Sequence, residues 1–144
     1  MTDPCDIARE MTDAWNRRDW KSFRELLHPS YSYTGSDGQT ENGPEVGLRV
    51  AQMYADAFPD GKLEVKSCVA DARHNTAVIE FTGIGTHRGE LMGIAPTGRK
   101  INIPVCDVVT IQDDKIVSER EYMDELVLLQ QLGVSQVPAQ AARR

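Results

Sequence analysis

Two acidic side chains near the end of the chain could work together as a general acid and a general base. Asp107 and Glu121 flank Asp113-Asp114, a pair that favours a tight turn between two strands. If Asp114 takes the left-handed conformation, residues whose numbers sum to an even value are paired, so Asp107 and Glu121 become near neighbours on one face. Two carboxyl groups this close cannot both ionise easily, and one should hold a proton near neutral pH. The carboxylate could then remove a proton from carbon, while the neutral acid donates a hydrogen bond to an enolate oxygen.

The same acidic residues also fit an ordinary solvated strand. Under this register Glu119 shares the face of Glu121, and both could simply face water beside nearby arginines. A register one residue out would place Asp107 and Glu121 on opposite faces. Asp124 is a further acid, but it stands where the last helix needs an N-cap, and we assign it that role.

The histidines and glycines suggest no metal and no cofactor. His28 precedes Pro29 at the expected end of a helix, where its ring could bond the last carbonyl groups, and His74 lies in a polar turn. His87 stands in a glycine-rich segment, residues 83–98, where it could contact a substrate or merely fix the hairpin. Three scattered histidines form no metal-binding pattern, and the glycine spacing fits no phosphate-binding motif.

The composition is that of a globular protein of one domain. The chain has 144 residues, of which 40% are hydrophobic and 26% charged. Its formal charge of −6 argues against a nucleic-acid or membrane partner, since nucleic acids and anionic membranes both require a basic face. We see no secretory leader and no apolar run of about 20 residues that could cross a membrane, so we expect a cytoplasmic protein.

Cysteine usage supports the same expectation. Cys5, Cys68 and Cys106 form no CxxC pair, and their number is odd. This pattern predicts reduced thiols and argues against a disulfide framework or a zinc site.

Helical and strand patterns follow one another in a definite order along the chain. Apolar residues at helical spacing predict three early helices at 4–16, 20–27 and 44–57. Asp3 and Asp19 are the expected N-caps of the first two. Alternation of apolar and polar residues predicts strands at 30–34, 62–70, 76–86, 99–112 and 115–123. Polar residues 35–43 are expected to form a loop, and a last helix runs from 125 to Gly133.

This order of elements predicts an α+β fold. Early helices, then a run of antiparallel strands, then a helix do not suit a parallel α/β sheet. A curved antiparallel sheet wrapped over the N-terminal helices would enclose a cavity. We expect residues 1–134 to form a single domain and residues 135–144 to be a frayed polar tail.

Several short pieces of the chain together resemble one family. They are Trp15-Asn16, His28-Pro29 with Tyr31, Gly43-Pro44, Ala57-Phe58-Pro59-Asp60, much of 85–99, Lys115-Ile116-Val117, Tyr122-Met123-Asp124 and Gln131-Leu132-Gly133. In these pieces the chain resembles the SnoaL-like polyketide cyclase family, within the nuclear-transport-factor-like superfamily. The resemblance covers nearly the whole chain and implies a cone-shaped α+β barrel with a hydrophobic pocket and a short C-terminal helix.

The resemblance also implies an activity and the residues that perform it. The best-understood members are cofactor-free cyclases that close a polyketide ring by an intramolecular aldol step. Glu121 matches their acid/base residue, and Asp107 matches the position of their assisting histidine. The aspartate departs from the family pattern, because it can act as a neutral donor only when it is protonated.

Eight residues are expected to line the substrate pocket. They are Trp15, Tyr33, Val50, Met53, Tyr54, Phe58, His87 and Met92. The resemblance supports Trp15 and Val50 best, because the matching positions line the pocket of the cyclases. The opposite face of the last hairpin carries Val108, Ile116 and Tyr122, which is too apolar for open solvent and predicts a homodimer interface.

The resulting hypothesis is a cofactor-independent acid/base enzyme, a lyase or isomerase. It would cyclise or isomerise an apolar, carbonyl-bearing small molecule, with Glu121 as base and Asp107 as acid. The glycine-rich segment would be mobile in the free protein and order over the ligand. Two alternatives stay open: a dimeric module that binds a small ligand without turning it over, and an epoxide-hydrolase-type activity on the same fold.

Overall fold

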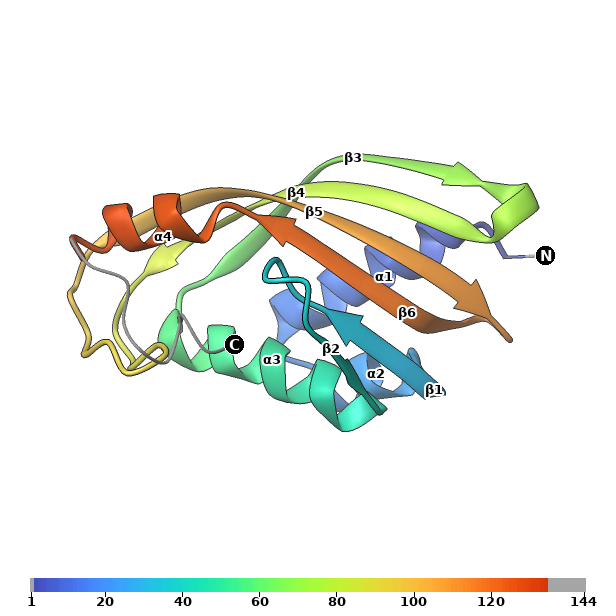
Figure 1. The fold of residues 1–144 in the computed structure, drawn as a ribbon, viewed down its shortest axis with the longest axis horizontal. Coiled ribbons are helices and arrows are strands. Elements are labelled where there is room, and N and C mark those ends of the chain that lie inside the picture. The colour runs from blue at the N-terminus through green and yellow to red at the C-terminus, as the bar shows by residue number, and fades with distance from the viewer. Residues whose placement is uncertain (1, 135–144) are drawn as a thin grey trace.

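A six-stranded sheet curves around three helices in the computed structural model, which describes residues 2–134 (Figure 1). The strands are β1 (Leu27–Thr34), β2 (Thr40–Asn42), β3 (Lys62–Asp71), β4 (Thr76–Thr86), β5 (Lys100–Gln112) and β6 (Lys115–Met123), in the spatial order β2-β1-β6-β5-β4-β3. The helices are α1 (Pro4–Arg17), α2 (Trp20–Glu25), α3 (Pro44–Ala57) and α4 (Glu125–Gln131), with a 3-10 turn η1 at Ala72–His74. The α+β fold with a curved sheet over the N-terminal helices is therefore confirmed. The expected frayed tail, 135–144, lies outside the described residues.

The helices begin where capping residues place them. The carboxylate of Asp3 accepts a hydrogen bond from the Cys5 amide at 2.9 Å, and that of Asp19 accepts one from the Ser22 amide at 3.1 Å. Asp124 accepts one from the Val127 amide at 3.1 Å, so its expected role as N-cap of α4 is confirmed. Each cap satisfies an amide that the first turn of a helix leaves unpaired.

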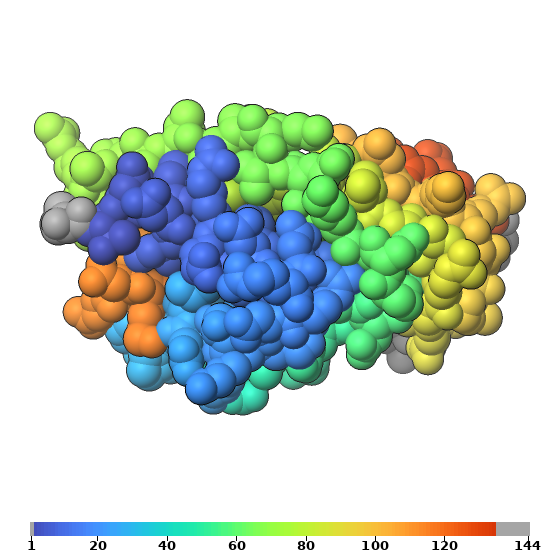
Figure 2. Space-filling model, turned by 180° about the vertical axis from the view of Figure 1, so that it is seen from behind, coloured from blue at the N-terminus to red at the C-terminus, as the bar shows by residue number. Residues whose placement is uncertain are grey.

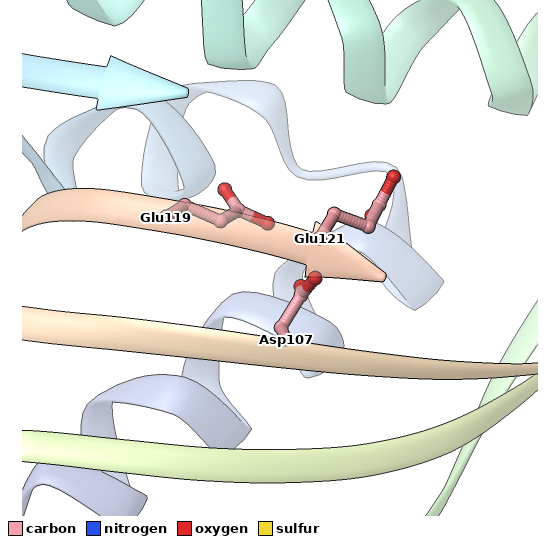
Figure 3. A group of neighbouring side chains, drawn as sticks. All are labelled: Asp107, Glu119 and Glu121. Atoms are coloured by element: carbon pink, nitrogen blue, oxygen red, sulfur yellow. The ribbon is translucent and has the colours of Figure 1, made fainter. Parts of the chain in front are cut away.

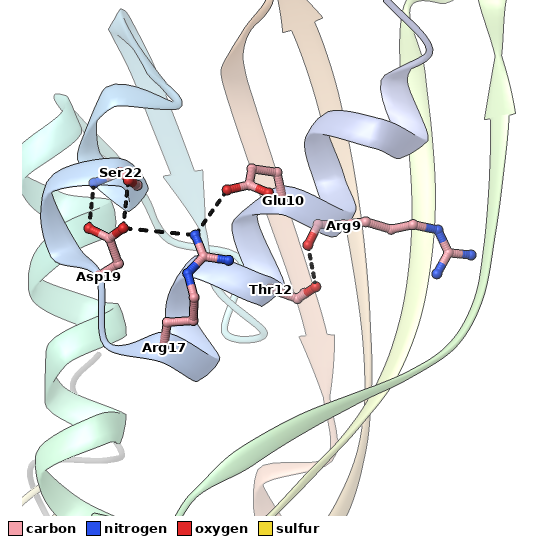
Figure 4. A network of polar contacts seen from close by, with 6 residues as sticks. All are labelled: Arg9, Glu10, Thr12, Arg17, Asp19 and Ser22. Atoms are coloured by element: carbon pink, nitrogen blue, oxygen red, sulfur yellow. Dashed lines mark hydrogen bonds and ion pairs between the residues drawn. The ribbon is translucent and has the colours of Figure 1, made fainter.

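A surface network ties the end of α1 to the start of α2. The Arg17 guanidinium lies 3.1 Å from Glu10 and 3.8 Å from Asp19, which in turn caps α2 (Figure 4). These groups are exposed, so their ion pairs add little to stability. The two helices cover much of one side of the molecule, as Figure 2 shows from behind.

Among the described residues, every helix is too short or too polar to cross a bilayer.

Strand β1 differs from the sequence expectation in its start and in its partner. Helix α2 ends at Glu25, and His28-Pro29 lies inside β1 instead of closing the helix. Proline lacks a ladder donor, and the pairing of β1 with β6 shifts register between Leu27 and Ser32, where Pro29 stands. The ring of His28 therefore bonds no helix carbonyl; its Nδ1 accepts from the Ser30 amide at 2.9 Å.

The pairing of β1 with β6 is parallel, whereas the other strand pairs are antiparallel. Its outer neighbour β2 forms within residues 35–43, which were expected to be a loop. Both features depend on contacts between segments far apart in the sequence, so local alternation could not show them.

The expected register of β5 and β6 is confirmed, but its cause is different. Asp113 and Asp114 both have positive φ, 55° and 57°, and Gln112 pairs with Lys115, as in a two-residue hairpin turn. A bulge then adds one residue to β6 between the pairs Ile111–Ile116 and Thr110–Ser118. Beyond the bulge the register is even.

The bulge has a consequence for the outer face of the sheet. It turns the fully buried Ile116 into the core, so its expected place at the centre of a homodimer interface is wrong. Tyr122 is 53% exposed on the outer face. The homodimer itself stays a prediction.

The expectation of three reduced thiols is wrong. Cys5 of α1 and Cys68 of β3 form a disulfide with a Cα–Cα distance of 5.9 Å, and Cys106 is free. The two partners are 63 residues apart in the sequence and meet only because α1 packs on β3, which residue spacing cannot reveal. The cytoplasmic expectation loses the support that it drew from reduced thiols.

The glycine-rich segment packs against the end of α3. The amides of Arg88 and Gly89 both donate to the carbonyl of Ala57, at 3.0 and 3.1 Å. A Cβ at position 89 would lie 2.3 Å from the Asp56 carbonyl oxygen, so this close approach requires glycine. Leu91 is fully buried. The expected mobility of residues 83–98 in the free protein stays a prediction.

Candidate active site

A cavity of about 110 Å³ lies between the concave face of the sheet and helices α1 and α3. Its wall is mostly apolar and includes Trp15, Phe81 and Ile103. The Trp15 indole is fixed by a hydrogen bond from its Nε1 to the Ala51 carbonyl, at 3.0 Å. Apolar walls with a few convergent polar groups are typical of sites that bind small molecules.

Three carboxyl groups form the polar floor of this cavity. Asp107 on β5 pairs directly with Glu121 on β6, and Glu119 lies two residues earlier on the same face of β6 (Figure 3). One oxygen from each lies within 4.8 Å of the others. Asp107 is 1% exposed and Glu119 7% exposed, so the alternative in which Glu119 faces water is wrong. Glu121 is partly buried. We call the three residues the carboxylate triad.

Two tyrosines of β1 donate hydrogen bonds to the triad. The Tyr31 hydroxyl donates to Oε1 of Glu119 at 2.7 Å, and the Tyr33 hydroxyl donates to Oε1 of Glu121 at 2.8 Å. Burial and then the nearby carboxylate charges raise the pKa of both phenols far above their usual value. Both hydroxyls therefore stay protonated and act as hydrogen-bond donors to the two glutamates.

Asp107 is the member of the triad whose neutral form is favoured by its surroundings. Complete burial raises its pKa well above the usual value, and the charges of Glu119 and Glu121 raise it further. Its Oδ1 has no hydrogen-bond partner among residues 2–134. A buried neutral carboxyl group is a hydrogen-bond donor, which an ordinary aspartate at neutral pH is not.

The triad is also the set of described side chains that could gather around a metal ion. Hard divalent cations prefer ionised oxygen ligands. Here Asp107 favours its protonated form, while Glu119 and Glu121 each accept a tyrosine hydroxyl. The donor set therefore suits a shared proton better than a cation.

Five of the eight residues expected in the pocket line the cavity: Trp15, Tyr33, Val50, Tyr54 and Phe58. Val50 and Tyr54 are four residues apart on α3 and so share the face that meets the sheet.

Met53, His87 and Met92 are not among the residues that line it. Met53 lies on another face of α3, because neighbouring helical positions point in different directions. Met92 stands in the turn of the glycine-rich segment, with φ 49°. His87 is fully buried behind Phe58, and its Nδ1 accepts from the Thr97 amide at 3.1 Å, so it fixes the hairpin.

Several residues of the site were not foreseen as such. Glu119 was placed on the correct face by strand alternation, but it was interpreted as solvated. Tyr31 showed only a match to a family pattern, and its bond to Glu119 needs the parallel pairing of β1 with β6. Lys62 lines the cavity and is exposed, which adds a cation to the wall of an otherwise acidic site.

Comparisons with known proteins identify the family to which the chain is similar. A model of the SnoaL-like polyketide cyclase family matches residues 5–132. The chain is 27% identical over 135 residues to the aklanonic acid methyl ester cyclase AcmA of Streptomyces galilaeus, covering 92% of each chain. Among solved structures it is similar to IdmH of Streptomyces antibioticus, a candidate polyketide cyclase, at 27% identity and a TM-score of 0.79, covering 92% of this chain and 100% of the other. It is also similar to AclR of S. galilaeus, a candidate hydroxylase, at 26% identity and a TM-score of 0.80, covering 97% and 87%.

Proposed function

The chain belongs to the SnoaL-like polyketide cyclase family, and we propose that it closes a carbon ring in an apolar small molecule that carries carbonyl groups. The reaction is an intramolecular aldol addition that needs no cofactor. The observation that carries the proposal is a neutral Asp107 paired with Glu121 on the floor of an apolar cavity. This arrangement holds an acid and a base side by side.

Glu121 and Asp107 then each have a task in the ring closure. Glu121 removes the proton from a carbon next to one carbonyl group, and Asp107 donates a hydrogen bond to the enolate oxygen that forms. The enolate carbon attacks a second carbonyl carbon of the same molecule, and a carbon–carbon bond forms as that carbonyl oxygen takes up the electron pair. The oxygen receives the proton that Glu121 removed. The product is an isomer of the substrate, so no oxidant or reductant is consumed.

The cavity suggests how the substrate is held. At about 110 Å³ the cavity is smaller than the roughly 150 Å³ cavity that holds benzene, so it takes up only the reacting part of a substrate. The rest of a polycyclic substrate would extend past Lys62 towards solvent. The Lys62 ammonium would favour an electron-rich oxygen, such as a phenolate or carboxylate, at the end of the molecule away from the triad.

A substitution series tests the assignment of base and acid. With aklanonic acid methyl ester as probe, Glu121→Gln should lower kcat/KM by about 10²–10⁴-fold with little change in affinity, because a positioned base is lost while shape is kept. Asp107→Asn should reduce the rate less, since the amide still donates. Asp124→Asn is the matched control and should leave the rate unchanged, because asparagine caps a helix as well as aspartate does.

Three outcomes would contradict the proposal. An intact rate in Glu121→Gln with a lost rate in Asp124→Asn would show that the wrong acid was assigned. Turnover that stops after chelation or in oxygen-free buffer would favour metal or hydroxylation chemistry over ring closure. Binding of the probe without any turnover, and without effect of the three substitutions, would favour the binding module.

A further inference from the structure

We propose that Tyr31 and Glu119 form a positioning pair that keeps the acid proton on Asp107, and that close packing at Gly47 holds Tyr31 in place. The role of this pair in catalysis rests on the proposed function, because ring closure is the reaction that would use the Asp107 proton. The location of the proton, however, is a property of the free protein and can be measured without a substrate.

The Tyr31–Glu119 pair is buried and well defined. Tyr31 is fully buried, Glu119 is 7% exposed, and the phenol oxygen lies 2.7 Å from Oε1 of the glutamate. A hydroxyl that donates to a carboxylate favours its ionised form, and the effect is larger where water is excluded. The Tyr31 hydroxyl therefore gives Glu119 a hydrogen-bond donor inside a buried site.

An unequal supply of donors decides which acid keeps the proton. Glu119 and Asp107 are close enough that both cannot ionise easily in a buried site. Glu119 has the Tyr31 donor, whereas Oδ1 of Asp107 has no partner within residues 2–134. The proton therefore stays on Asp107, where it can be donated into the cavity.

Gly47 provides the room that this contact needs. A Cβ at position 47 of α3 would lie 2.8 Å from the Tyr31 hydroxyl oxygen and 2.9 Å from the ring atom Cε1. It would also lie 2.9 Å from Cδ1 of Leu27 on the same strand. Glycine in a helix interior is less favourable than alanine. At this position the cost is offset by an approach of α3 to β1 that no larger residue permits.

Other charged and titratable groups face the same acid, and the pair acts against that background. Strand β6 contributes Glu119 and Glu121, and strand β1 contributes Tyr31 and Tyr33. Tyr54 of α3 and Lys62 of β3 line the same cavity, and Cys106 is the neighbour of Asp107 on β5. Helix α1 lines the cavity with Met11, Thr12 and Trp15, which do not titrate. Among the described residues, Tyr31 donates to Glu119 and Tyr33 donates to Glu121, so each tyrosine serves a different glutamate.

The test is a titration of the Asp107 carboxyl carbon by NMR in protein labelled at aspartate, with Asp107→Asn to assign the signal. In Tyr31→Phe the midpoint should fall by about one pH unit, because Glu119 then competes for the proton. Gly47→Ala should move it in the same direction by displacing Tyr31. Glu119→Gln should lower it most, since the charge that opposes ionisation of Asp107 is gone. Tyr122→Phe removes an exposed hydroxyl on the outer face and should leave it unmoved.

The pH dependence of kcat/KM tests the Tyr31–Glu119 pair independently of the titration. Because the neutral form of Asp107 is the active one, the rate is lost as pH rises through its pKa. The basic limb of the kcat/KM profile should therefore move to lower pH in Tyr31→Phe. A lower rate with an unmoved limb would mean a merely structural role and would overturn the proposal.

The titration also separates this inference from the proposed function. An unmoved midpoint in both Glu119→Gln and Gly47→Ala overturns the pair, and it remains decisive if Tyr31→Phe does not fold. A shifted midpoint in a protein that closes no ring supports the pair and removes only the proposed function.

Discussion

Two aspartates, one in the turn after α3 and one on the cavity floor, are held in opposite protonation states. Asp60 is exposed and accepts hydrogen bonds from the amide and the hydroxyl of Thr86, at 2.7 and 2.8 Å. The bond from the amide, and then the bond from the hydroxyl, lower the pKa of Asp60. Asp107 is buried beside two glutamates, and its pKa is raised.

The difference indicates that Asp60 is a structural carboxylate, whereas Asp107 is suited to acid/base chemistry. The turn that carries Asp60 is saturated with partners, because the Arg18 guanidinium also donates to the carbonyls of Phe58, Pro59 and Gly61. Among residues 2–134, Oδ1 of Asp107 has no hydrogen-bond partner, and the raised pKa of this group favours a proton that it can donate. Satisfied polar groups stabilise a fold, whereas buried groups with shifted pKa values and unmet hydrogen bonds mark sites of chemistry.

Among the structural contacts of the protein, the disulfide between α1 and β3 is expected to contribute most to stability. Cys5→Ser combined with Cys68→Ser opens a covalent loop of 63 residues and should lower the free energy of unfolding by about 4 kcal/mol, on the chain-entropy account. The triad should be undisturbed, so the rate per folded molecule should hold. Denaturant unfolding measures the first effect, with Cys106→Ser as control. A loss below about 1 kcal/mol would show that the disulfide does not secure α1 to β3.

Asp107 should lower the stability of the folded protein while it supports activity. In the unfolded chain Asp107 ionises at its usual pKa, but in the folded protein it keeps its proton, so wild-type stability falls as pH rises above the unfolded pKa. Asp107→Asn removes this cost and should stabilise the protein near pH 7 by about 0.5–2 kcal/mol while slowing turnover. Thermal unfolding at several pH values checks this. A variant less stable than wild type at pH 7 would mean that Asp107 serves structure, like Asp60.

The structural carboxylate should show a smaller effect with the opposite sign. Because the folded pKa of Asp60 is lowered, its contribution is present above the unfolded pKa and is lost as pH falls through the folded one. Asp60→Asn should cost about 0.5–1 kcal/mol near pH 7 after solvent screening, and less in acid, with the rate unchanged. Unfolding at pH 7 and pH 3 tests this. If the variant lost activity but not stability, the contrast between the two aspartates would fail.

Local features of the chain were readable from sequence because short-range contacts decide them. Asp3, Asp19 and Asp124 cap helices through amides two or three residues away, and no other part of the molecule is needed. The alternation along β6 placed Glu119 and Glu121 on one face for the same reason.

Only the tertiary structure decided how the carboxyl groups are surrounded. The parallel pairing of β1 with β6 brings Tyr31 to Glu119, 88 residues away in sequence. The close approach of α3 at Gly47 and the disulfide between α1 and β3 likewise join distant segments. Protonation depends on burial and on neighbours contributed by other elements. The sequence therefore determined which acids share a face, while the packing of distant elements determined that Asp107 carries the proton.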